Sequence, residues 1–202
     1  MYHIGIDSKP YWKSSSNSSN FNSSIASAIM ITDYAHFQEK FIECFKIVMK
    51  KHGILTERII SKGFEIKKKG AGYYIILEFL KDLSKYIKRL YVYYTTFTVP
   101  NNEITINPKG NPENVTIYYF LRHHLDNYFP MVCYWDLSQK KKDIGGECNF
   151  YLDSFQGSNS NAWENIKHNT DFWVLPSGDK VNSLIAASDL FNHHITSNSK
   201  SL

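Results

Sequence analysis

The sequence predicts an α/β fold in which a mixed sheet is flanked by helices. The chain of 202 residues opens with an alternating strand pattern followed by a second apolar run, and the pair predicts a hairpin. In the second half, short apolar strands are separated by helical stretches, which is typical of parallel strands joined by crossovers. We therefore expect one domain over residues 1–202.

The first elements are two strands and a helix. Tyr2 to Asp7 alternates in polarity and predicts a strand, and Ile25 to Thr32, rich in Ile and Ala, predicts its partner. The Ser- and Asn-rich tract 13–24 between them offers little to bury, so we expect a mobile loop at the hairpin tip. Asp33 is placed to cap a helix over Tyr34 to His52, whose apolar residues fall on one stripe.

The middle of the chain alternates between helical and extended patterns. Tyr73 to Leu90 predicts a helix, and Leu90 to Val99, a run of Tyr, Thr, Val and Phe, predicts a strand. Pro112 to Phe129 predicts a helix, because Pro is favourable in a first turn. Met131 to Asp136 is a short apolar segment, and residues 140–146 predict a loop.

The last quarter contains the elements that predict a parallel sheet. Cys148 to Asp153 and Asp171 to Leu175 predict strands, with a short helix over Asn159 to Lys167 between them. Val181 to Thr196 predicts the closing helix, and residues 197–202 are expected to fray.

Composition excludes several classes of protein. Three cysteines without ligand spacing argue against a disulfide framework and against a structural zinc site. We expect a cytoplasmic protein without a membrane partner, because the sequence shows no signal peptide and no apolar run that could span a bilayer. The net charge of +4 is compatible with phosphate binding but does not establish it.

Acidic residues at the ends of predicted strands and inside the last helix predict a site. Asp7 and Asp153 each close an apolar strand, and Asp189 lies within a mostly apolar helix, where a carboxylate is costly to bury unless it is paired or bound to a metal. Folding would bring these acids together as ligands of a divalent metal ion. Asp179 precedes the last helix, and capping is its favoured role.

Basic and imidazole side chains add weaker candidates. His193 lies four residues after Asp189 on the predicted helix and could orient that carboxylate or transfer a proton. Two lysine clusters could follow a phosphate backbone, although a solvated surface is the better explanation for either cluster taken alone. The clusters are Lys67, Lys68 and Lys69, and Lys140, Lys141 and Lys142.

The order of these elements resembles the RNase H-like superfamily. The segments Gly5-Ile-Asp7-Ser, Ser177-Gly-Asp179 and Ala187-Ser-Asp189-Leu are similar to the domain-of-unknown-function family 3800 within it. The resemblance implies that clustered acids hold two divalent ions, Mg²⁺ or Mn²⁺. It also implies a further ligand, Glu65 in Lys62-Gly-Phe-Glu65, and admits Asp179 to the same set.

The leading hypothesis is a metal-dependent phosphodiesterase that cleaves nucleic acid by a two-metal mechanism. Asp7, Asp153 and Asp189 would be its metal ligands and, with His193, its catalytic residues. The alternative is a non-catalytic nucleic-acid-binding or assembly protein with the same fold, and a small-molecule phosphohydrolase is a third option. The partner expected is DNA or RNA, and a homodimer is one open oligomeric state.

Overall fold

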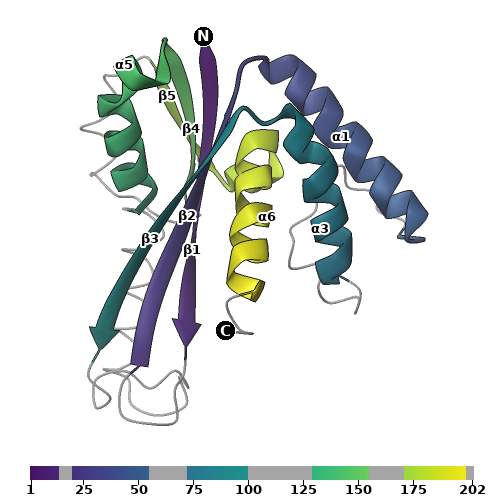
Figure 1. The fold of residues 1–202 in the computed structure, drawn as a ribbon, viewed down its shortest axis with the longest axis horizontal. Coiled ribbons are helices and arrows are strands. Elements are labelled where there is room, and N and C mark those ends of the chain that lie inside the picture. The colour runs from purple at the N-terminus through teal and green to yellow at the C-terminus, as the bar shows by residue number, and fades with distance from the viewer. Residues whose placement is uncertain (14–19, 55–71, 100–128, 155–170, 199–202) are drawn as a thin grey trace.

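The protein is built on a five-stranded mixed sheet with strand order β3-β2-β1-β4-β5. The computed structural model describes residues 1–13, 20–54, 72–99, 129–154 and 171–198. The strands are β1 (Tyr2–Lys13), β2 (Asn20–Ile31), β3 (Arg89–Val99), β4 (Cys148–Ser154) and β5 (Phe172–Pro176). Strands β1, β2 and β3 pair antiparallel, whereas β4 pairs parallel with both β1 and β5. The predicted fold class, an α/β fold with a mixed sheet flanked by helices, is confirmed (Figure 1).

The predicted hairpin exists, but its strands are longer than the sequence indicates. The ladder between β1 and β2 runs from His3–Ile31 to Lys13–Phe21, so much of the tract 13–24 is strand. Asn20 also pairs with Val99 of β3. The loop prediction for 13–24 was therefore wrong at Lys13 and at 20–24, and residues 14–19 lie outside the described residues.

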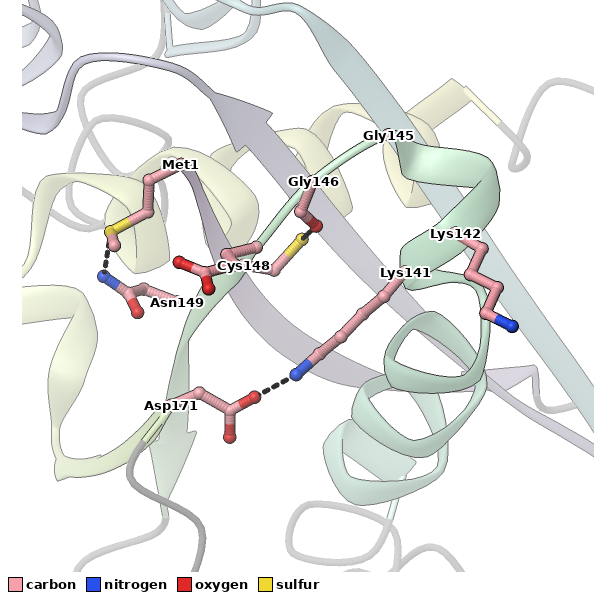
Figure 2. A pocket seen from close by; sticks show the side chains of 9 residues that line it. Met1, Lys141, Lys142, Gly145, Gly146, Cys148, Asn149 and Asp171 are labelled. Carbon is pink, nitrogen blue, oxygen red and sulfur yellow. Dashed lines mark hydrogen bonds and ion pairs between the residues drawn. The ribbon is translucent and has the colours of Figure 1, made fainter.

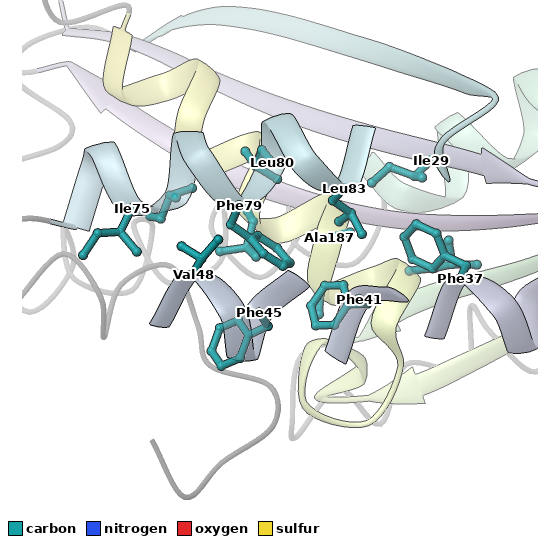
Figure 3. Close-up of a cluster of buried hydrophobic side chains, with 14 of the residues drawn as sticks. Ile29, Phe37, Phe41, Phe45, Val48, Ile75, Phe79, Leu80, Leu83 and Ala187 are labelled. Atoms are coloured by element: carbon teal, nitrogen blue, oxygen red, sulfur yellow. The ribbon is translucent and has the colours of Figure 1, made fainter. Parts of the chain in front are cut away.

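Two helices form the outer layer on one face of the sheet. Helix α1 (Tyr34–Lys51) is capped by Asp33, whose Oδ1 accepts from the backbone N–H of His36 at 2.9 Å, as predicted. Helix α3 (Gly72–Leu83) ends earlier than predicted, in a 3₁₀ turn, η1 (Ser84–Tyr86). The Phe79 ring lies edge-on to Phe41 and Phe45, with centroids 5.1 and 5.8 Å apart. Figure 3 shows this core between α1, α3 and the sheet.

The opposite face of the sheet is covered by residues 129–139, which are helical, and by the short helix α5 (Lys141–Ile144) (Figure 1). Cys133, Tyr134 and Leu137 pack there against strand residues that include Ile4 and Ile6. The loop predicted over 140–146 was thus wrong in part, and the short apolar segment Met131 to Asp136 is helical. A six-residue apolar run fits a buried helix as well as a strand.

Helix α6 (Ser183–Asn198) lies directly on the sheet, inside α1 and α3 (Figure 1). It begins two residues later than predicted and extends through Asn198, into the segment 197–202 that was expected to fray. Residues 199–202 lie outside the described residues. The predicted helices over 112–128 and 159–167 lie outside them too. No helix within the described ranges is long and apolar enough to cross a membrane.

Candidate carboxylate site

Asp7 and Asp153 are placed side by side by the parallel pairing of β1 and β4. Ile6 pairs with Leu152, so the next residue on each strand is an aspartate in the same register. Successive residues on a strand point to opposite faces. Because Ile6 and Leu152 pack into the core beneath helix 129–139, both aspartates face the α6 side of the sheet.

Close docking of α6 on β1 brings the last helix to these acids. A Cβ on Gly5 would lie 2.4 Å from the Cβ of Leu184, so only glycine admits the helix at this distance. Ser188 Oγ donates to the Gly5 carbonyl at 2.9 Å, and Asn192 Nδ2 donates to the Asp7 carbonyl at 3.0 Å. These bonds fix the rotation of α6 and place Asp189, which follows Ser188, beside the strand.

A tight turn after β5 brings a fourth acid into the same neighbourhood. Ser177 has a left-handed backbone, with φ of 50°, and the 3₁₀ turn η2 (Gly178–Lys180) follows. The backbone N–H of Gly178 donates to Asp153 Oδ1 at 2.6 Å. A Cβ on Gly178 would lie 3.2 Å from that oxygen and 2.5 Å from Ile185 Cδ1. Asp179 follows and is buried.

Asp7 is buried among these acids, with only 6% of its surface exposed. Burial raises the pKa of the Asp7 carboxyl well above its ordinary value, and the negative charges of Asp189, Asp153 and Asp179 raise it further. The backbone N–H of Ser8 acts in the opposite direction. Four carboxyl groups from two strands, a turn and a helix therefore interact around Asp7.

His193 lies at the outer side of this cluster. Its Nε2 is 3.8 Å from Asp189 Oδ1, one turn earlier on α6. The Lys9 ammonium contacts the same imidazole from β1. The predicted proximity of His193 to Asp189 is therefore observed, and the histidine lies between a carboxylate and a lysine.

The donor set matches a hard divalent cation in type, because Mg²⁺ and Mn²⁺ prefer carboxylate oxygens. Within the described ranges, however, no three His, Cys, Asp or Glu side chains are grouped closely enough to hold one ion together. The acids thus share a neighbourhood without forming a complete coordination shell.

Asp179 does not have the role that the sequence favoured. The cap of α6 is Asn182, whose Oδ1 accepts from the backbone N–H groups of Leu184 and Ile185 at 3.0 and 3.2 Å. Asp179 lies inside η2 and acts on the Asp7 carboxyl instead. The capping interpretation was therefore wrong. The sequence interpretation overlooked Asn182, which is itself a preferred N-cap residue and lies nearer the start of α6.

Of the predicted nucleic-acid-binding lysines, Lys140, Lys141 and Lys142 are described, and they do not lie beside the acids. Lys140 pairs with Asp136 at 2.7 Å, and Lys141 pairs with Asp171. A pocket of about 810 Å³ lies next to them (Figure 2). It is lined by Met1, Lys141, Lys142, Gly145, Gly146, Glu147, Cys148, Asn149 and Asp171. Because Cys148 begins β4 and Asp153 is near its end, roughly 17 Å of strand separates the pocket from the acids.

The other predicted lysine cluster, Lys67, Lys68 and Lys69, lies outside the described residues, as does Glu65. The sequence reasoning missed Asn192, Ser27 and Gly178, which position the acids. Ser27 Oγ donates to Asn192 Oδ1 at 2.6 Å, which fixes the amide that contacts Asp7. The available sequence signal was the spacing of Ser188 and Asn192, two polar residues four positions apart on one face of a mostly apolar helix.

Fold and site together define an α/β protein with a five-stranded mixed sheet and a cluster of carboxyl groups between the sheet and α6. The chain belongs to the family described as Domain of unknown function (DUF8203), whose model matches residues 11–200. This match does not support the narrower resemblance to family 3800 that was drawn from the sequence.

The chain is similar to a curated protein and to several solved structures. An uncharacterized protein of Archaeoglobus fulgidus is 26% identical over 187 residues, which are 85% of this chain and 53% of that protein. The chain thus spans about half the length of this relative. The solved PCNA:RNase HII complex from Archaeoglobus fulgidus matches at 13% identity and a TM-score of 0.47, over 98% of this chain and 73% of the other.

The ribonuclease H2 from Pyrococcus horikoshii OT3 matches at 13% identity and a TM-score of 0.43, over 100% of this chain and 74% of the other. At such identities and scores the likeness does not extend to activity, substrate or partners.

Proposed function

We propose that this protein is a metal-dependent phosphodiesterase that cleaves nucleic acid at the Asp7 carboxylate cluster. The observation that carries the proposal is the buried Asp7 carboxyl, whose pKa is raised by burial and by three neighbouring acids. Such a cluster is electrostatically unfavourable in the folded state unless a cation or protons compensate it. Strongly perturbed groups of this kind gather at functional sites more often than elsewhere.

Asp7, Asp153 and Asp189 would hold one or two divalent ions, Mg²⁺ or Mn²⁺, and Asp179 would complete the set. Such ions supply Lewis-acid stabilisation of the negative charge that develops on phosphate oxygens. The chain itself positions the donors. Asn192 fixes the Asp7 backbone, and the Gly178 N–H holds Oδ1 of Asp153.

His193 would have a positioning role in this proposal. Its ring is 3.8 Å from Asp189, too long for a hydrogen bond but short enough to orient the carboxylate electrostatically. It is also the group in the cluster best suited to exchange a proton near neutral pH.

A non-catalytic nucleic-acid-binding protein is the second candidate. The observation that favours it is the spacing of the acids, which do not form a closed group of three within the described residues. Neither the described residues nor the relatives support a homodimer, so we propose no oligomer.

The test is cleavage of single- and double-stranded DNA and RNA with Mg²⁺, Mn²⁺ or a chelator. We expect metal-dependent cleavage by the wild type and a loss of at least about 100-fold in Asp7→Asn and Asp189→Asn, because Asn keeps the shape of Asp but removes the charge that binds a cation. We expect a similar loss in Asp179→Asn, since this acid belongs to the cluster.

Asp143→Asn is the matched control, because Asp143 is an exposed acid on α5, away from the cluster. It should cleave like the wild type. Cleavage that survives in the Asp7→Asn, Asp189→Asn double variant would exclude this site. Nucleic-acid binding without cleavage in the wild type would favour the second candidate.

A further inference from the structure

A row of stacked aromatic rings crosses the sheet on the face that carries the acids. Tyr151 stacks on Trp173 with centroids 5.2 Å apart and an interplanar angle of 16°. Tyr151 also stacks on Tyr34 of α1, at 5.3 Å and 26°. His3 contacts both tyrosine rings, and its Nδ1 is 3.1 Å from the Tyr151 hydroxyl. These contacts fix the Tyr151 and Trp173 rings in parallel planes.

The row and the acids occupy neighbouring positions of the same strands. Tyr151 pairs with Trp173, and Asp153 lies two residues beyond Tyr151 on β4, so all three side chains face α6. One strand spacing and two residues of rise separate Trp173 from Asp153, roughly 8 Å between Cα atoms. A single nucleotide spans a comparable distance between its phosphate and its base.

Packing accounts for His3, Tyr34 and Tyr151 but not for the exposed ring of Trp173. His3, Tyr34 and Tyr151 are partly buried beside the core, as cross-strand aromatic pairs commonly are. Trp173 is on β5 at the end of the strand order and keeps 42% of its surface exposed. A rigidly held and exposed indole next to a group of carboxylates is a suitable surface for an aromatic ligand.

We infer that Trp173 is a stacking platform for a nucleobase of the nucleic acid whose phosphodiester is at the carboxylate cluster. The inference rests on the proposed function for its substrate class and deepens it. Stacking on an indole requires an unstacked base and tolerates any base. The site therefore favours single-stranded or locally splayed nucleic acid over an intact duplex.

The test measures binding separately from cleavage. A single-stranded oligonucleotide is titrated in chelator while tryptophan fluorescence is recorded, and an abasic sugar-phosphate oligomer of equal length serves as the second probe. We expect Trp173→Leu to weaken oligonucleotide binding about tenfold and to remove most of the quenching. Binding of the abasic oligomer should not change, and Trp173→Tyr should recover most of the affinity.

Trp135→Leu is the matched control. Trp135 is 67% exposed, but it belongs to helix 129–139 on the opposite face of the sheet. This variant should bind like the wild type. Melting curves of both variants show whether each is folded at the assay temperature. Equal affinity of Trp173→Leu and wild type for the oligonucleotide, or an equal loss for the abasic oligomer, would overturn the inference.

The two proposals fail in different ways. Base-dependent binding through Trp173 without any metal-dependent cleavage would keep the platform and reject the nuclease. Cleavage lost in Asp7→Asn together with unchanged binding and cleavage in Trp173→Leu would keep the nuclease and reject the platform.

Discussion

Asp7 is held by the fold in an environment that disfavours its charged form. Its carboxyl is buried, and its pKa is raised first by desolvation and then by three neighbouring acids. Because the folded state binds the proton more tightly than the unfolded state, the stability of the protein falls as the pH rises from the ordinary value towards the raised pKa. Above the raised pKa the full destabilisation is present.

Asp7→Asn should therefore melt at a higher temperature than the wild type near neutral pH without added metal. The gain should shrink as the pH falls through the raised pKa and disappear below the ordinary value of 3.8. Each kcal/mol gained corresponds to about 2–4 °C for a chain of this size. Thermal melts from pH 3 to 8 measure the difference, and a pH-independent difference would contradict the account.

Gly5 is a second residue on which the site depends, because α6 approaches β1 most closely there. In Gly5→Ala the new methyl would meet the Cβ of Leu184 at 2.4 Å and its carbonyl carbon at 2.7 Å. We expect a loss of about 1–3 kcal/mol in the free energy of unfolding, measured with denaturant, since the helix must shift.

Gly146→Ala is the comparison for that variant. Its Cβ would lie 3.3 Å from the Tyr2 ring, the far part of a movable side chain. It should cost much less than Gly5→Ala. Similar losses in the two variants would show that the close contact between α6 and β1 is not tight in solution.

At the scale of elements, the start of α6 depends on Asn182 and not on Asp179. Asn182→Ala removes the acceptor for the N–H groups of Leu184 and Ile185 and should destabilise the protein by about 1 kcal/mol. Asp179→Asn should be neutral or stabilising without metal, because it removes one charge that acts on Asp7. Urea unfolding of both variants decides, and a loss of stability in Asp179→Asn would contradict the repulsion between Asp179 and Asp7.

Strand β2 shows how neighbouring elements override local preference. Its first residues, from Asn20 to Ser24, have weak strand propensity and predicted a loop. They pair on one side with β1 and on the other with β3, whose Tyr- and Thr-rich sequence is strongly strand-forming. A central strand gains two ladders of hydrogen bonds, which compensates for poor intrinsic propensity.

At the scale of the whole molecule, the two faces of the sheet differ in what packs against them. One face packs on helix 129–139 and α5 through an apolar cluster, and the other carries the acids, the aromatic row and α6. The Lys140 to Lys142 cluster lies near the start of β4, and two of its members are paired with acids. A nucleic acid that contacted both these lysines and the carboxylate cluster would have to run along β4.

Metal binding should be visible as stabilisation of the whole protein. A cation that binds only the folded state stabilises it by about 2.7 kcal/mol at a concentration 100 times the Kd, or several degrees in melting temperature. We expect a Mn²⁺ titration to raise the melting temperature of the wild type and of Asp143→Asn. Asp7→Asn should start higher without metal and gain little, and equal shifts in all three proteins would place binding elsewhere.

The sequence by itself determined the fold class, the helical stripe of α1 with its Asp33 cap, and the pattern of Asp7, Asp153 and Asp189. These depend on local periodicity, capping and strand ends, which a linear chain displays directly. The length of the hairpin and the helical state of residues 131–136 were not determined locally, because pairing and burial against distant segments decided them.

Only the tertiary structure decided which acids share a neighbourhood and what holds them there. The parallel register sets Asp7 beside Asp153, and the missing side chain of Gly5 admits α6. Asp179 is buried in the turn η2, and α6 is capped by Asn182 instead. The same holds for the ring of Trp173, which meets Tyr151 only through the pairing of β4 with β5. Distances between residues far apart in sequence follow from register and helix docking, and neither is encoded at any single position.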